Sequence, residues 1–189
     1  VACEENDDTL LEQQLNKPCS PNFQDANQTT PLYAAARNGC LKCVLLLLEA
    51  GADKEKRNGG TRATALYVAA ANGHLEVVRL LVESGANMEQ GTKDVGATSL
   101  FIAAQEGHLE VVRFLVESGA NKDQGQTDLG ATPLFIAAHE GHLEVVRFLV
   151  VSGANKDQGT TDNGATPLYV AAQQGNLEVV RFLVESGAN

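Results

Sequence analysis

The chain has 189 residues, about the length of one domain, and 43% of them are apolar, which is enough for a core and excludes a disordered tail. Its 24 acidic and 14 basic residues give a formal charge of -10, which disfavours a general nucleic-acid binder. No apolar run approaches the ~18 residues that a membrane span needs, so we expect none.

All four cysteines lie in the first quarter of the chain, at Cys3, Cys19, Cys40 and Cys43. Most of the chain lies beyond them, so no pairing of these residues would make a secreted disulfide scaffold. The sequence starts at Val1 without a basic stretch followed by an apolar one, and no signal peptide is predicted. We expect an intracellular, cytoplasmic protein of which this chain is an excerpt.

The first predicted helix covers residues 8–15 and is more polar than the helices that follow it. It precedes a repeat that fills the rest of the chain, and Val1-Ala2 matches an alanine pair of that repeat. We interpret residues 1–29 as an incomplete N-terminal capping repeat whose outer side meets water.

From residue 30 onward the sequence repeats every 34 residues. Each unit opens with the pattern T-x-L-[YF], and the opening threonines are Thr30, Thr64, Thr98, Thr132 and Thr166. Units 98–131 and 132–165 differ at only five of 34 positions, which indicates that one structural unit is reused. Within one domain, 1–189, the predicted full repeats are 30–63, 64–97, 98–131 and 132–165, and the truncated fifth is 166–189.

Each unit is predicted to hold two short helices. The opening threonine, such as Thr132, can accept backbone N–H bonds as an N-cap, and Pro133 then occupies the first helical position, where a missing N–H costs nothing. The first helix carries an alanine pair that allows close packing, and it ends near a glycine such as Gly141, which suits a left-handed turn. The second helix, as in 108–116, has too many apolar positions for one stripe and should be buried between neighbours.

A polar stretch closes each unit, and residues 155–164 are long enough for a projecting hairpin-like loop. The whole pattern, T-P-L-x-x-A-A-x-x-G-H-L-E-V-V-R-x-L-V-x-x-G-A, resembles the ankyrin repeat over nearly the whole chain. The resemblance implies an all-α fold, an ankyrin-repeat solenoid of stacked helix–turn–helix units with projecting loops. This chain departs from the family in its period of 34 instead of 33, with the extra residue most easily placed in the loop. It also carries aromatic residues where the family often has histidine after T-P-L: Tyr33, Tyr67, Phe101, Phe135 and Tyr169.

At the far end, Leu177, Val179, Val180, Phe182 and Leu183 repeat the apolar pattern of the interior units. We therefore expect further repeats, or another covering element, to follow in the parent protein.

Histidines and serines recur in single registers, as at His74 and His108, whereas catalysis needs unlike groups that converge. The sequence from His139 to His142 has the spacing H-E-x-H and a glycine where the helix of a zinc protease must continue, so a metal site there is disfavoured. We predict no catalytic residue, no metal and no cofactor. Catalysis within this segment would require turnover that a substitution of His139 or Cys43 abolishes.

Cys40-x-x-Cys43 has the spacing of half a zinc or redox site. The two cysteines take the places of His74 and Val77 in the next unit, so core packing is favoured unless Cys3 and Cys19 converge there.

The second helices carry charges in rows, such as Glu110, Arg113 and Glu117, with the same pattern in neighbouring units. We interpret them as a solvated outer face in which each pair adds only a few tenths of a kcal/mol. Val151 interrupts one row of glutamates, and sequence drift is favoured over a docking point.

Positions that vary between near-identical units are candidates for recognition, because the scaffold leaves them free. In ankyrin-type folds the loop tips and the exposed side of the first helix line a concave face, and the variable positions fall there. The aspartates Asp94, Asp128 and Asp162, which do not vary among these three units, would make that face acidic together with Glu106 and Glu140. The candidate partner-binding residues are Arg37, Asn38, Ala71, Asn72, Asp94, Val95, Gln105, Glu106, Asp128, Leu129, His139, Glu140, Asp162, Asn163, Gln173 and Gln174.

The leading hypothesis is a non-catalytic protein-binding module with an acidic, concave recognition groove, whose partners are other proteins with basic or amphipathic segments. Neutral drift at solvent-exposed sites is the alternative explanation of the variable positions. Two other functions remain open: a regulatory or targeting segment of a larger enzyme, channel or ubiquitin ligase, and a purely structural spacer.

Overall fold

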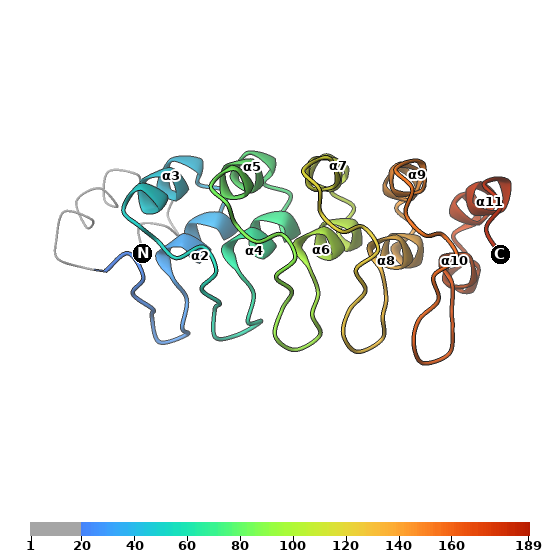
Figure 1. The fold of residues 1–189 in the computed structure, drawn as a ribbon, viewed down its shortest axis with the longest axis horizontal. Coiled ribbons are helices and arrows are strands. Elements are labelled where there is room, and N and C mark those ends of the chain that lie inside the picture. Colours follow the sequence, from blue (N-terminus) through green and yellow to red (C-terminus); the bar gives the residue numbers. More distant parts are fainter. Residues whose placement is uncertain (1–19) are drawn as a thin grey trace.

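The computed structural model describes residues 20–189, and ten helices in this part of the chain form five consecutive pairs (Figure 1). The first helices of the pairs are α2 (Pro31–Arg37), α4 (Ala65–Ala71), α6 (Ser99–Gln105), α8 (Pro133–Glu140) and α10 (Pro167–Gln174). The second helices are α3 (Leu41–Glu49), α5 (Leu75–Glu83), α7 (Leu109–Glu117), α9 (Leu143–Val151) and α11 (Leu177–Glu185). The described residues contain no strand, so the predicted all-α repeat solenoid is confirmed. The helix expected over 8–15 lies outside the described residues, as do Cys3 and Cys19.

The pairs stack side by side into an elongated molecule (Figure 1). The first helices form one row and the second helices another, and the connecting loops project on the side away from the second helices. Each first helix packs on the first helix of the next pair and on its own second helix. Among residues 20–189, every helix is too short or too polar to cross a membrane.

The opening threonines start the first helices as predicted. Each threonine hydroxyl accepts a hydrogen bond from the backbone N–H three residues later, at distances of 3.1 to 3.3 Å. Proline occupies the first helical turn at Pro31, Pro133 and Pro167, while Ala65 and Ser99 take this position in the other two units.

A glycine separates the two helices of each pair and has a positive φ, as the sequence predicted. It also lies against the next pair: a Cβ atom built at Gly107 would be 2.7 Å from the imidazole of His142. That imidazole donates from Nε2 to the carbonyl oxygen of Gln105 at 2.9 Å. His74 and His108 make the same bond to the preceding pair, and Asn176 makes the corresponding contact with its amide. The histidines therefore tie neighbouring pairs together.

The core runs continuously along the stack between the two rows of helices. Each of the first four pairs contributes two leucines that are at most 1% exposed: Leu32, Leu47, Leu66, Leu81, Leu100, Leu115, Leu134 and Leu149. Burial of one such side chain stabilises the fold by about 1.5–3 kcal/mol. Cys40 and Cys43 are buried in the same core, which agrees with the packing role expected of them.

The loops are held to one another by a second set of bonds. Each loop is closed by a backbone bond of the type Thr92 N–H to Ala97 C=O, 3.0 Å long, which gives it the predicted hairpin-like shape. Between loops, the backbone N–H of Asn155 donates to the carboxylate of Asp123 at 2.8 Å, and the N–H of Thr161 donates to the carbonyl of Leu129 at 2.9 Å. The loops therefore form one connected layer along the stack.

The charged rows lie on the exposed side of the second helices, and the expected pairs of glutamate with arginine three residues later are present at 3.7 to 3.9 Å. Each arginine of α5, α7 and α9 also lies over a phenylalanine ring of the next pair, with Arg113 4.8 Å from the centre of the Phe148 ring. The sequence did not predict this cation–π contact, because it joins residues 35 apart in the chain. Val151, which interrupts the glutamate row, is 82% exposed.

Candidate partner-binding surface

The sixteen candidate residues occupy two kinds of place. Ten of them lie at the C-terminal ends of the first helices: in α2, α4 and α6 they are the last residue and the C-cap, and in α8 and α10 they belong to the last helical turn. The other six are loop-tip residues. None of the sixteen side chains is buried. Both sets are therefore accessible to a partner.

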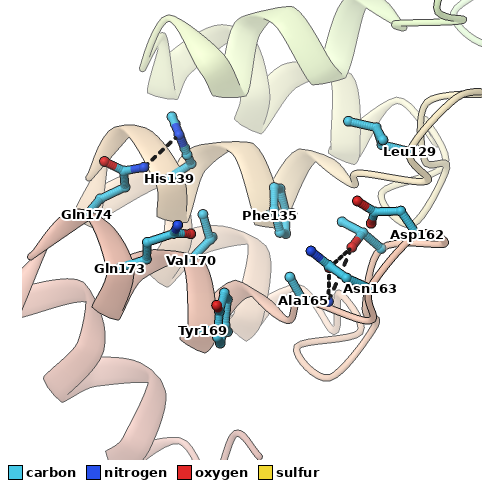
Figure 2. A pocket seen from close by; sticks show the side chains of 11 residues that line it. Leu129, Phe135, His139, Asp162, Asn163, Ala165, Tyr169, Val170, Gln173 and Gln174 are labelled. Atoms are coloured by element: carbon cyan, nitrogen blue, oxygen red, sulfur yellow. Dashed lines mark hydrogen bonds between the residues drawn. The ribbon is translucent and has the colours of Figure 1, made fainter.

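The structure brings six of the sixteen residues together around one pocket of about 340 Å³ between α8, α10 and the two adjoining loops (Figure 2). We call it the Asp162 pocket, and the candidate residues that line it are Leu129, His139, Asp162, Asn163, Gln173 and Gln174. Thr160, Phe135, Ala165, Tyr169 and Val170 complete the lining. The other ten candidates, from Arg37 to Glu140, do not line this pocket.

The sequence did not predict the aromatic floor of the Asp162 pocket. Phe135 and Val170 lie between the helix residues and the loop residues, and Tyr169 extends the apolar surface (Figure 2). The signal that could have found it is the aromatic residue that follows T-x-L in every unit, which the sequence alone suggests is there for packing. Part of its ring surface is instead open: Phe135 is partly exposed and Tyr169 is 58% exposed.

On the helix side, a chain of hydrogen bonds holds three candidate residues. Nδ1 of His139 lies 2.8 Å from Oε1 of Glu140, and Nε2 of Gln174 lies 3.0 Å from Nε2 of His139. An amide N–H₂ can only donate, so the imidazole accepts at Nε2 and donates from Nδ1 to the carboxylate. These two contacts fix the ring at the edge of the Asp162 pocket.

On the loop side, the carboxyl of Asp162 lies next to Asn163. The hydroxyl of Thr160, followed by the backbone N–H of Asn163, lowers the pKa of Asp162 below its usual value, so this exposed group is ionised at neutral pH. The amide oxygen of Asn163 accepts from the Ala165 N–H at 2.9 Å and lies 3.0 Å from the Thr160 hydroxyl oxygen. Asn163 is therefore folded onto its own loop.

Two units earlier, Asp94 lies in a different electrostatic setting. Hydrogen bonds from the Thr92 hydroxyl and the Val95 N–H lower the pKa of Asp94, and the charge of Arg62 lowers it further. Tyr67 lies near Asp94 and Glu106, and burial together with those negative charges raises its pKa to about 12. A loop-tip residue and a helix-end residue of the candidate set therefore both act electrostatically on Tyr67.

The histidines near the Asp162 pocket do not gather with other metal-ligating groups. Among residues 20–189, no three His, Cys, Asp or Glu side chains are placed to hold a metal ion. His142 is committed to the carbonyl of Gln105, while His139 faces Glu140 and Gln174. The arrangement offers a carboxylate, amides and an aromatic floor to an approaching side chain.

The comparisons with known proteins agree with this architecture. A family model described as ankyrin repeats (3 copies) matches residues 1–94, 61–126 and 100–189. The crystal structure of the human ASB11 ankyrin repeat domain has a TM-score of 0.88 and 28% identity, covering 100% of this chain and 82% of that one. An ankyrin repeat domain from Acinetobacter baumannii AYE has a TM-score of 0.86 and 30% identity, covering 100% of this chain and 96% of that one.

A shorter match is to the potassium channel AKT1 of Arabidopsis thaliana, which is 56% identical over 43 residues. These residues are 23% of this chain and 5% of the channel, so the match concerns a small part of that curated relative.

Proposed function

The chain belongs to the ankyrin repeat family, a family of protein-interaction modules, and from this premise we propose that it is a non-catalytic module that binds another protein. The binding surface is the concave side formed by the ends of the first helices and the loop tips. The observation that carries the proposal is the Asp162 pocket, where six of the candidate residues line one hollow.

Preorganisation supports this proposal. The imidazole bonds between pairs and the bonds between loops fix both halves of the surface before a partner arrives. A partner therefore binds with little ordering cost on the side of the repeat, which leaves more of the contact energy as affinity.

The chemistry of the surface favours a basic or amphipathic partner segment. The acidic candidates Glu106, Asp128, Glu140 and Asp162 are all exposed, and the tip residue Leu129 supplies an apolar contact. Opposite charge on the partner would speed the encounter and set its register.

Affinity capture from a cell extract tests the proposal with two matched variants of the full chain. The first neutralises the concave side with Glu106→Gln, Asp128→Asn, Glu140→Gln and Asp162→Asn. The second removes the same number of charges from the second helices with Glu76→Gln, Glu110→Gln, Glu144→Gln and Glu178→Gln. We expect the first variant alone to lose the captured partner and the wild-type interaction to weaken with salt. A partner whose binding responds neither to the first variant nor to salt would rule out the acidic groove.

A second candidate function is favoured by the match to a potassium channel: this chain is the regulatory or targeting segment of a larger enzyme, channel or ubiquitin ligase. The sequence of the parent transcript decides this point. A channel, kinase or ligase domain in the same reading frame would support it, whereas a parent made of repeats alone would contradict it.

A further inference from the structure

One substitution distinguishes the loop at the Asp162 pocket from the two loops before it. Asn163 stands where those loops carry Val95 and Leu129. Val95 packs against the cluster of Ala97, Phe101 and Ala131. Asn163 instead folds back onto Thr160 and Ala165, within its own loop.

The aromatic rings beside these loops also differ in how much of their surface is covered. Phe101 lies between the loops that carry Val95 and Leu129, and it is 4% exposed. Phe135 is the same residue of the next unit and lies between the loops that carry Leu129 and Asn163, and it is partly exposed. The Asp162 pocket forms a hollow beside Phe135, lined by Leu129 from one loop and by Asn163 from the next.

The hollow combines apolar and charged walls. Its floor is made of Phe135, Val170 and Ala165, and its rim carries the Asp162 carboxylate (Figure 2). Within the described part of the chain, no ion pair involves Asp162, whereas Arg62 contributes positive charge near Asp94. A carboxylate beside an apolar floor attracts a cationic group that has an apolar stem.

We propose that the Asp162 pocket is a specificity site for one arginine side chain of the bound partner. This inference rests on the proposed function and adds the chemistry of one anchor to it. The aliphatic stem of this arginine lies over Val170 and Phe135. Its planar guanidinium stacks on an aromatic ring of the pocket. The guanidinium N–H groups donate to the Asp162 carboxylate in a bidentate pair.

Other side chains fit these walls less well. A lysine ammonium has no planar face to stack on the rings and cannot form a two-bond fork with the carboxylate. An acidic side chain is repelled by Asp162, and an aliphatic one removes water from that carboxylate without replacing its hydrogen bonds. The volume of about 340 Å³ is near the lower end of the roughly 300–1,000 Å³ typical of ligand pockets, which suits one long side chain.

A random peptide library displayed on phage tests the inference even though the partner is unidentified. The library is selected in parallel on the wild-type chain, on Asn163→Leu and on Asp162→Asn. Asn163→Leu places a larger apolar side chain in the lining of the hollow, and the preceding loop already carries leucine at this position, so the variant should fold normally. The matched control is Glu110→Gln, which removes one charge from the second helices. Circular dichroism confirms that each variant is folded.

We expect peptides with a fixed arginine to be enriched on the wild type and on Glu110→Gln, and to lose that enrichment on the two pocket variants. The best peptide is then synthesised with arginine, lysine, citrulline or leucine at that position. We expect the three replacements to weaken binding to the wild type by about tenfold or more, because hydrogen bonds to a charged group are lost. On Asn163→Leu the four peptides should bind alike.

Two results would overturn the inference while leaving the proposed function intact. One is the enrichment of peptides without a fixed arginine; the other is arginine enrichment that persists on Asn163→Leu and Asp162→Asn. If the wild type enriches no peptide at all, both the inference and the proposed function fail together.

Discussion

The glycine between the two helices of a pair serves two purposes at once. Gly107 adopts a φ of 74°, and it leaves room for the His142 ring of the next pair. The sequence predicted the left-handed turn from the position of glycine in each unit. It did not predict the close approach to His142, because that contact depends on how the pairs stack.

Alanine substitutions at two glycines separate these purposes. Gly107→Ala should destabilise the fold by about 1–2 kcal/mol through the left-handed backbone and by about 1–3 kcal/mol more by displacing His142 from the Gln105 carbonyl. Gly175→Ala should show the backbone effect alone, since Gly175 has a φ of 75° and nothing within 4 Å of its Cβ position. Urea unfolding measures both, and equal losses would contradict the role assigned to the imidazole contact.

Ser99 occupies a position where three other units carry proline, and its buried hydroxyl has no hydrogen-bond partner. Ser99→Pro should therefore stabilise the chain by about 1 kcal/mol, because it removes an unsatisfied group and restricts the unfolded chain. Ala65→Pro is the control, since it tests proline at the same helical position without a hydroxyl to remove. A higher urea midpoint is expected for both, with the larger increase for Ser99→Pro; a decrease for Ser99→Pro would refute the explanation.

The raised pKa of Tyr67 makes the stability of the fold depend on pH in the alkaline range. Its pKa in the folded chain is about 12, above its ordinary value of 10.0, so the unfolded chain loses the phenolic proton first. The stability that this shift contributes is complete below pH 10 and is lost as the pH rises toward 12. The free energy of unfolding should fall more between pH 8 and pH 11 for the wild type than for Tyr67→Phe. Parallel pH profiles of the unfolding free energy for the two proteins would show that folding does not raise the pKa of Tyr67.

At the scale of helices, the second-helix row is more than a solvated surface. Arg113 reaches both Glu110 in its own helix and the ring of Phe148 in the next pair. The regular spacing of charges predicted the first contact. The second depends on the offset between stacked helices, which the sequence of one unit does not specify.

Alanine substitutions of two arginines in equivalent positions measure how much this cation–π contact stabilises the fold. Arg113→Ala should cost about 0.5–1 kcal/mol more than Arg181→Ala, because both residues pair with a glutamate but only Arg113 lies over a described aromatic ring. Phe148→Leu should remove the difference in a double-mutant cycle. If both alanine variants are equally stable in urea, the cation–π contact contributes nothing measurable.

The positions and order of the helices were predictable because each unit carries residues that mark where its helices begin and end. Thr132 and Pro133 mark the start of α8, Gly141 its end, and the apolar spacing of 143–151 the buried side of α9. Five near-copies of this pattern make the stacking predictable as well. The bonds between loops, such as Asn155 to Asp123, could not be predicted, because they join the backbone of one unit to a side chain of another.

At the scale of the whole molecule, the candidate residues were located by sequence, but their grouping was not. Six of them, including His139 and Asn163, line the Asp162 pocket together with the unpredicted Phe135 and Tyr169. The grouping depends on which loop lies over which helix, and that follows from stacking geometry.

The central claim is that a partner protein occupies the side formed by the first-helix ends and the loop tips. Hydroxyl-radical footprinting of the chain, alone and with its captured partner, tests this claim most directly. The partner should lower the oxidation of Leu129 and Tyr169 and leave the exposed Leu45 and Val151 of the second helices unchanged. Protection of Leu45 and Val151, with Leu129 and Tyr169 oxidised as in the free chain, would contradict the account.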